Sequence, residues 1–331
     1  MRTRLIVAIV AAVLATPSLS GSAVSPQAVR RTVAREGRVT VGNASLYTRE
    51  VGQGPPAIVL HGGPDFDIGY LLPDLDRLAD RFRLIYYDQR GRGKSADHVA
   101  PDDVTLASDV DDVDQVRQHF QLESATLLGH SWGTVLALEY ALRHPTRVSR
   151  MILMNPAPAS ASDLALFKKA YTQRLGADLD RQRTIIASSA YQEGDPEAVV
   201  ARYRLHFRPA FARADDFEKL MATMKTGFIS QGKAGIVKAR AVEDRLMRDT
   251  WNKDSYDLTS KLRNLNIPTL VIVGDHDFIP VEVAAHIASA IPNARLVTLR
   301  NCGHFGFLEC PDQVRGAVDG FFRAAPAARR N

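Results

Sequence analysis

The sequence predicts an α/β fold built on a mostly parallel, doubly wound sheet that is interrupted by a helical insertion. Short continuous apolar runs, typical of strands buried on both faces, alternate with helical patterns over residues 57–154 and again over 269–322. The segment between them, residues 157–251, carries helical patterns and no convincing buried strand. Because alternating strands and helices form parallel sheets covered on both faces, the two alternating segments are expected to make one core.

The first part of the core, residues 24–156, begins with a polar lead-in and two strands around a turn at Gly42-Asn43. Pro55-Pro56 then breaks the chain before the first buried strand. Strands are expected at residues 38–41, 45–50, 57–60, 83–87, 125–128 and 148–154. Helices are expected at residues 74–81, 105–120 and 132–144.

The insertion, residues 157–251, is expected to be a helical cap, and the core resumes in a second part at residues 252–323. Within the cap, helical patterns cover residues 181–191, 196–206, 216–224 and 233–248. The second part of the core continues the alternation with strands at 269–273 and 295–299 and helices at 281–291 and 311–322. The last residues, 324–331, are expected to form a disordered tail.

The N-terminus has the three-part layout of a secretory signal peptide. Arg2 and Arg4 give a basic start, an apolar run covers Leu5 to Ala15, and small or turn-forming residues follow up to Ala23. The apolar run is too short to span a bilayer comfortably. We therefore expect cleavage after residue 23, a secreted or periplasmic protein, and no stable membrane insertion afterwards. The alternative is an uncleaved N-terminal anchor.

The composition is that of a globular protein with a sizeable core, since 45% of the 331 residues are apolar and 24% are charged. The formal net charge of +5 falls to near +3 once Arg2 and Arg4 are removed, and no long basic run remains. We expect no nucleic-acid partner. The expected partner is a small-molecule or short-peptide substrate.

A serine nucleophile is predicted by Gly129-His130-Ser131-Trp132-Gly133, which lies directly between an expected strand and an expected helix. A sharp strand-to-helix turn of this kind lifts the serine hydroxyl to the top of the sheet, and its flanking glycines avoid clashes of Cβ atoms. The N-terminus of the helix helps to stabilise negative charge. Without that context G-x-S-x-G is a weak motif, so its position makes Ser131 the candidate nucleophile.

A serine hydroxyl needs a base, and the order expected for this turn is Ser, then an acid, then His. His304 follows the last expected strand and is the candidate base. Asp277 follows the preceding strand and is the preferred acid, with Asp275 as the alternative. Cys302 and Cys310 could form a disulfide that stiffens the His304 loop, or they could remain unpaired. Other roles explain the remaining downstream histidines: His144, His206, His276 and His286.

Two backbone amides are expected to form an oxyanion hole. One belongs to Trp132, the residue after the nucleophile. The other belongs to the loop His61-Gly62-Gly63-Pro64 after an early strand, where Gly63 is preferred and Gly62 is the alternative. The sequence has no H-E-x-x-H and no clustered set of His, Cys and carboxylate residues, so no catalytic metal is expected.

Together with Gly303-His304, three longer motifs resemble the proline iminopeptidase branch of the α/β-hydrolase superfamily. They are His61-Gly62-Gly63-Pro64, Asp88-Gln89-Arg90-Gly91-Arg92-Gly93-Lys94-Ser95 and Gly129-His130-Ser131-Trp132-Gly133-Thr134. The resemblance covers about residues 40–156 and 252–323. It implies an eight-stranded α/β-hydrolase sheet with a helical cap, no cofactor, and release of N-terminal residues, often proline, from peptides.

The sequence departs from that family at the expected amine-binding site. The family usually continues H-G-G-P with glycines, whereas Asp65-Phe66-Asp67 follow here. The family's cap carries a Trp-Glu pair whose glutamate helps to hold the substrate amine, whereas Trp251 is followed by Asn252. None of the acidic residues in the insertion is marked out by its sequence: Glu193, Glu197, Glu218 and Glu243. Asp65 and Asp67 are candidates to bind the amine, and a solvated acidic loop is the alternative.

The predicted activity is therefore hydrolysis of an amide through an acyl-enzyme, as in an aminopeptidase of the proline iminopeptidase type. A carboxylesterase or lactonase would use the same three residues. Carboxylates that project from the cap toward Ser131 would distinguish the two, because only an exopeptidase has to hold an ammonium group. A non-catalytic binding protein would be expected to lack one member of the triad, and all three are present.

Overall fold

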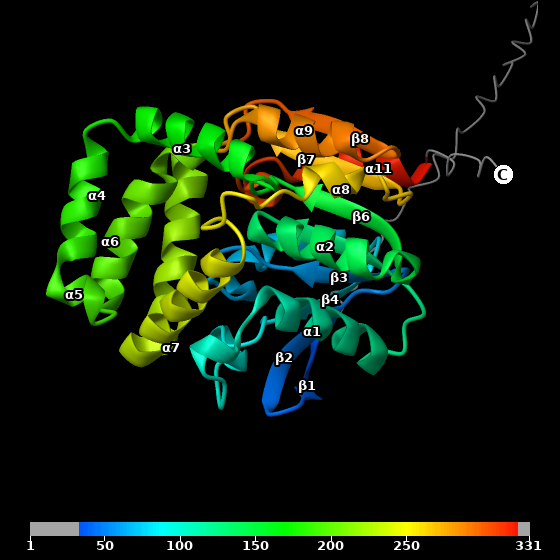
Figure 1. Cartoon of the computed structure of the whole chain (residues 1–331), viewed down its shortest axis with the longest axis horizontal. Coiled ribbons are helices and arrows are strands. Elements are labelled where there is room, and N and C mark those ends of the chain that lie inside the picture. Colours follow the sequence, from blue (N-terminus) through cyan, green and yellow to red (C-terminus); the bar gives the residue numbers. More distant parts are fainter. Residues whose placement is uncertain (1–32, 324–331) are drawn as a thin grey trace, which may run out of the picture. The chain divides into compact units, whose positions relative to one another are not determined.

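The computed structural model describes residues 33–323, so the expected signal at 1–23 and tail at 324–331 lie outside the described residues. Its eight strands form one sheet in the order β1-β2-β4-β3-β5-β6-β7-β8 (Figure 1). The strands are β1 Arg35–Val41, β2 Ala44–Val51, β3 Pro56–Leu60, β4 Arg83–Tyr87, β5 Ala125–His130, β6 Val148–Met154, β7 Thr269–Gly274 and β8 Ala294–Leu299. β2 pairs antiparallel with β1 and β4, and every other pair is parallel. The predicted fold class is confirmed.

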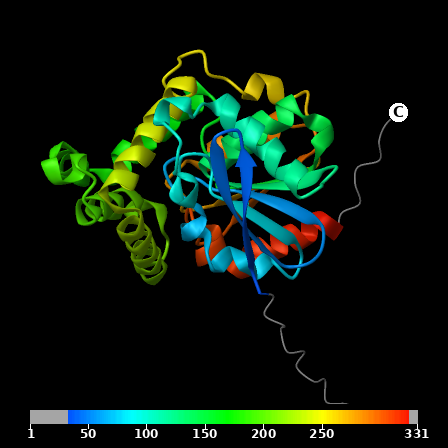
Figure 2. The same cartoon turned by 90° about the horizontal axis from the view of Figure 1, so that it is seen from below.

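Helices cover both faces of the sheet, as a doubly wound sheet requires (Figure 2). One layer consists of α1 Leu106–His119, α2 Trp132–Arg143, α8 Thr259–Leu262 and α9 Val281–Ala290, and neighbouring helices in this row contact one another. The opposite layer consists of η2 Asp74–Leu78, α10 Gly306–Glu309 and α11 Pro311–Arg323. The helix expected at residues 74–81 is therefore a short 3-10 turn. The other 3-10 turns are η1 Ile68–Leu71, η3 Gly93–Ser95, η4 Pro101–Asp103, η5 Pro145–Arg147 and η6 Arg208–Ala210.

Between β6 and α8 the chain forms five helices, which lie together on the left of Figure 1. They are α3 Ala161–Leu175, α4 Asp178–Ala187, α5 Ser189–Gln192, α6 Pro196–Phe207 and α7 Ala214–Asp249. No helix was predicted over α3, whose buried face is narrow. The helices expected at 216–224 and 233–248 are two arms of α7, which kinks at Gly232 where φ is +66°. A glycine adopts this conformation without a steric penalty, so the chain can bend at Gly232 and continue as a helix on both sides.

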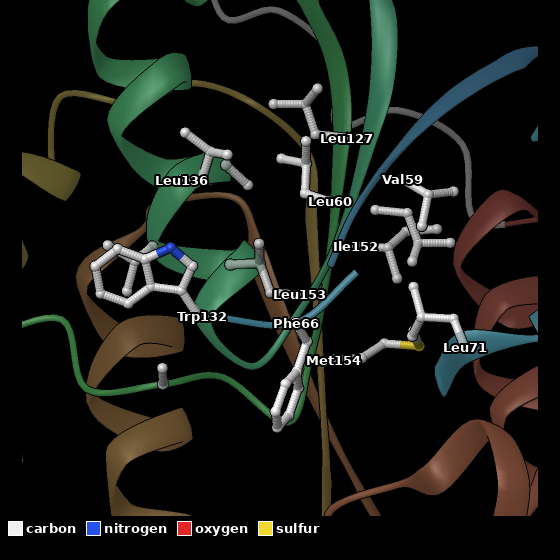
Figure 3. Packing of buried hydrophobic residues seen from close by; sticks show 14 of the residues in the cluster. Val59, Leu60, Phe66, Leu71, Leu127, Trp132, Leu136, Ile152, Leu153 and Met154 are labelled. Atoms are coloured by element: carbon white, nitrogen blue, oxygen red, sulfur yellow. The ribbon is translucent and has the colours of Figure 1, made fainter. Parts of the chain in front are cut away.

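Apolar side chains from the central strands and α2 form the core beneath the candidate site (Figure 3). Val59 of β3, Leu127 of β5 and Ile152 of β6 are at most 1% exposed. Trp132, at the start of α2, is also buried and packs edge-on against Trp251, with ring centroids 5.2 Å apart. This contact joins the core to the end of the insertion. Within residues 33–323, no helix combines the length and the apolar character needed to cross a membrane.

Candidate active site

Ser131 lies in a sharp turn between the end of β5 and the start of α2, as predicted. Its backbone has φ +54° and ψ −122°, a conformation that non-glycine residues rarely adopt and that concentrates at functional sites. A Cβ at Gly129 would lie 2.6 Å from the carbonyl oxygen of Gly133. A Cβ at Gly133 would lie 2.0 Å from the carbonyl oxygen of Leu60 in β3. Both glycines are therefore required for α2 to pack closely behind the serine.

We expect Gly133→Ala to lower the free energy of unfolding by about 3 kcal/mol or more, because the backbone of β3 or α2 has to move. A glycine-to-alanine change inside a helix normally stabilises the protein, so a loss of stability here would be caused by the clash of the new Cβ. Urea unfolding measures it. Gly316→Ala in α11 is the matched control, since its Cβ would meet nothing within 4 Å, and it should stabilise the protein by about 0.5–1 kcal/mol. Equal stabilities of the two variants would contradict this account.

His304 and Asp277 come together from the loops that follow β8 and β7. Nδ1 of His304 lies 2.9 Å from Oδ1 and 3.0 Å from Oδ2 of Asp277, and both residues are 2% exposed. The Asp277 carboxylate also accepts hydrogen bonds from the Ile279 amide (2.9 Å) and from Nδ2 of Asn155 (2.8 Å). Asp275 instead accepts from the Cys302 amide (3.1 Å) and bonds His276. Of the two candidate acids, Asp277 is the one that contacts the histidine.

The loop that carries His304 is held on several sides. Cys302 and Cys310 form a disulfide, with Cα atoms 6.1 Å apart, which decides between the two alternatives. The His304 amide donates to the Ala210 carbonyl (2.7 Å) in the insertion. The Glu309 carboxylate accepts from the amides of Gly303 (3.0 Å) and Ala212 (2.8 Å). Burial raises the pKa of Glu309 to about 7, against these stabilising amides.

A chain of hydrogen bonds joins the His304 loop to the glycine loop. Nε2 of His130 lies 2.9 Å from the His304 carbonyl oxygen, which can only accept, so Nε2 carries the proton and Nδ1 is an acceptor. The Tyr70 hydroxyl therefore donates to Nδ1 (2.8 Å) and accepts from the Gly62 amide (2.7 Å). Burial lowers the pKa of His130, which agrees with a neutral ring. No sequence pattern indicated this network, because Tyr70, His130 and His304 are far apart in the sequence.

This network also separates the two candidate amides of the glycine loop. The Gly62 amide is already bonded to Tyr70, which leaves Gly63 as the candidate. Trp132 is the first residue of α2, where amides have no partner within the helix. The loop is fixed from beneath, because Gln89 donates its amide to Nε2 of His61 (3.0 Å) and its side-chain nitrogen to the His61 carbonyl (2.9 Å).

Ser131 and His304 both line a cavity of about 200 Å³ between the core and the insertion. Asp65 lines it too, and at 5% exposure it is not part of a solvated loop. Asp67 does not line it. Asp67 faces a separate cavity of about 540 Å³ and accepts from the Gly69 amide (2.7 Å) and Nε2 of Gln231 (3.1 Å). The expected acidic pair is therefore divided: Asp65 lies at the Ser131 cavity, and Asp67 caps the N-terminus of η1.

The insertion contributes polar side chains to the wall of the Ser131 cavity, namely Arg202, Tyr203, His206 and Glu243. The Tyr203 hydroxyl donates to Oδ2 of Asp65 (2.5 Å). Burial raises the pKa of Asp65, and burial with the neighbouring Asp65 raises the pKa of Glu243 to about 8. Within residues 33–323, no cluster of three or more His, Cys, Asp or Glu could hold a metal ion.

Glu243 differs in its contacts from the other acidic residues of the insertion, from which its sequence pattern does not distinguish it. Glu193, Glu197 and Glu218 each pair with a surface lysine or arginine. Glu243 lies one turn before Met247, which lines the same cavity, so the two share the inward face of α7. That spacing was visible in the sequence, but the kink at Gly232 had to be known before the inward face could be assigned.

Comparison with known proteins identifies the family. Residues 55–311 match the family model described as the alpha/beta hydrolase fold, and the chain belongs to this family. It is 29% identical over 293 residues to a proline iminopeptidase of Heyndrickxia coagulans, an alignment that covers 86% of this chain and 97% of the relative. The protein is therefore a hydrolytic enzyme of the α/β-hydrolase type, similar to proline iminopeptidases.

Two solved structures agree with this assignment. The proline iminopeptidase-related protein of Thermus thermophilus superposes with a TM-score of 0.69 at 26% identity, covering 89% of this chain and 99% of that chain. Est816, described as an N-acyl homoserine lactone degrading enzyme, superposes with a TM-score of 0.65 at 22% identity, covering 86% and 100%. At that identity the second likeness shows the fold alone.

Proposed function

We propose that the protein hydrolyses an amide bond through an acyl-enzyme formed on Ser131. Nε2 of His304 takes the hydroxyl proton as Ser131 Oγ attacks the carbonyl carbon, and the same proton then passes to the leaving amine. Asp277 keeps the proton of His304 on Nδ1 and stabilises the imidazolium. The amides of Gly63 and Trp132 hold the oxyanion. Water then releases the acyl group by the same steps. The bond between His304 and Asp277 and the shared cavity with Ser131 support this assignment.

We further propose that the enzyme is an aminopeptidase of the proline iminopeptidase type. The observation that carries this proposal is the pair of carboxylates in the Ser131 cavity, Asp65 from the glycine loop and Glu243 from the insertion. An exopeptidase has to hold the free amine of its substrate, and a bound ammonium would lower the raised pKa of both carboxyls. The cavity is smaller than the range of about 300–1,000 Å³ usual for drug-sized ligands, which suits a single terminal residue.

Glu243→Gln should lower kcat/KM for proline and alanine p-nitroanilides by about 100-fold relative to p-nitrophenyl acetate measured on the same variant. Truncating one partner of a buried charge pair costs about 2–5 kcal/mol, and the acetate has no amine to lose. N-acetylation of the anilides should abolish their cleavage by the parent. Glu197→Gln, which changes a surface glutamate paired with Lys225, is the matched control and should leave the ratio unchanged.

Thermal unfolding of Glu243→Gln shows whether a loss of activity in this variant is caused by loss of the folded protein. The pKa of Glu243 is about 8 in the folded protein and 4.5 ordinarily, so the folded state binds the proton more tightly. Stability from this group is thus greatest below pH 4.5 and declines as the pH rises to about 8. Glutamine removes that decline. We therefore expect the melting temperature of the variant to exceed that of the parent by about 1–2 °C at pH 9, which corresponds to about 1 kcal/mol, and by less at pH 5.

A carboxylesterase or lactonase is the second candidate, favoured by the apolar remainder of the cavity. Phe167, Phe207, Met247, Phe278 and Phe305 line it. With a pKa of about 8, Glu243 would also be largely neutral near pH 7 in the empty site. Under this alternative the protein cleaves p-nitrophenyl acetate or a lactone but not the anilides. Glu243→Gln should then leave kcat/KM for the ester unchanged, because the ester has no amine for Glu243 to bind.

A further inference from the structure

Arg202 is a charged residue of the Ser131 cavity for which the mechanism above has no use. It lies on α6, it is half-buried, and its guanidinium stacks on the Tyr203 ring with Cζ 4.3 Å from the ring centroid. Its Nε is buried and has no hydrogen-bond partner. Within the described part of the chain, its guanidinium makes no ion pair with a carboxylate within 4.0 Å. A cation is thus held in the wall of the site with its donors unpaired.

Burying Nε of Arg202 without an acceptor is costly, because that donor loses water and gains no partner. Asp65 and Glu243 are close enough to attract the guanidinium through space, yet neither forms an ion pair with it. The guanidinium lies over the Tyr203 ring, and its terminal N–H groups form no hydrogen bond within the described part of the chain. A planar, preorganised edge of this kind suits a carboxylate, which it can bind with two parallel hydrogen bonds.

We propose that the site selects an acyl residue that carries a carboxylate as well as a free amine. Arg202 pairs with the carboxylate, and Asp65 and Glu243 pair with the ammonium. This inference rests on the proposed aminopeptidase function and narrows its substrate class. The three side chains line the same cavity as Ser131. The ammonium of an aminopeptidase substrate lies on the acyl side of the scissile bond, and we assign the carboxylate to the same residue. The same chemistry is present in an N-terminal glutamate linked through its α-carbonyl and in a glutamate linked through its γ-carbonyl.

The test compares kcat/KM for L-glutamate α-p-nitroanilide, L-glutamate γ-p-nitroanilide and L-glutamine p-nitroanilide. The parent should cleave one of the two glutamate compounds at least tenfold better than the glutamine compound, and which one it is identifies the linkage. Arg202→Met should remove that preference, so that the ratio of kcat/KM for glutamate and glutamine falls about tenfold or more, mainly through KM, and Arg202→Lys should restore part of it. Arg208→Met, at a surface arginine near Asp178, is the matched control and should keep the parent's preference.

Two results would overturn the inference. The first is a parent enzyme without preference for either glutamate compound over glutamine. The second is an Arg202→Met variant that slows the glutamate and glutamine compounds equally, which would mean that Arg202 only balances Asp65 and Glu243. Proline and alanine anilides, run in parallel, separate the two proposals. If they are cleaved while glutamate is not preferred, only this inference fails. If no free-amine anilide is cleaved and the acetate is, the aminopeptidase function fails with it.

Discussion

Ser131→Ala is expected to lower kcat/KM by about 10⁴- to 10⁶-fold for every substrate that the protein cleaves, esters included. Without Oγ no acyl-enzyme can form, and only binding and the oxyanion hole remain to accelerate attack by water. The reduction should appear in kcat, while KM stays near that of the parent. Steady-state hydrolysis of p-nitrophenyl acetate and of the preferred anilide measures it.

Alanine retains the Cβ of serine, so the strained turn with φ +54° is preserved and stability should change by less than about 1 kcal/mol. Ser289→Ala removes an exposed hydroxyl on α9 and is the matched control, for which parental rates are expected. Turnover of Ser131→Ala at the rate of the parent would rule out the serine mechanism.

Asp277→Asn should lower kcat by about 10⁴-fold. The carboxylate holds the proton of His304 on Nδ1, and an amide in its place can donate to that nitrogen and stabilise the wrong tautomer. The new amide would also face Nδ2 of Asn155, which now donates to the carboxylate. Pre-steady-state release of p-nitrophenol from the acetate ester follows acylation directly and should slow by the same factor.

Asp275→Asn is the matched change at the other candidate acid. That side chain is 37% exposed and bonds the Cys302 amide and His276, so we expect less than about tenfold loss. A larger loss at Asp275 than at Asp277 would reverse the assignment of the acid.

Local patterns were sufficient to predict the sheet and the residues attached to its strands. The parallel strands were predicted to within two residues. Short apolar runs marked β3, β4, β5 and β7 because these strands are buried on both faces, whereas β8 is only partly buried. Ser131, Asp277 and His304 each follow a strand, so a correct sheet carries them to the same edge. Gly63 was identified in the same way, by its place after β3.

The remainder of the site depends on contacts between distant segments. Tyr203 reaches Asp65 across 138 positions of the sequence, and no local pattern reports such a bond. Asp65 and Asp67 look alike in the sequence, yet they face different cavities, and Asp67 caps the N-terminus of η1. Glu243 and Arg202 come from two helices whose inward faces are set by their packing on each other.

The glycine loop places two functions within three residues of chain. Under the proposed mechanism, the Gly63 amide receives the oxyanion and the Asp65 carboxylate receives the substrate amine. A Cβ on Gly63 would lie 2.4 Å from the Asp65 amide, so the loop is too tightly folded for one function to move without the other. The spacing of Gly63 and Asp65 in the loop therefore sets the number of bonds between the substrate amine and the carbonyl under attack. A different cleavage position would require a new loop, whereas a different side-chain preference would require changes only in the insertion.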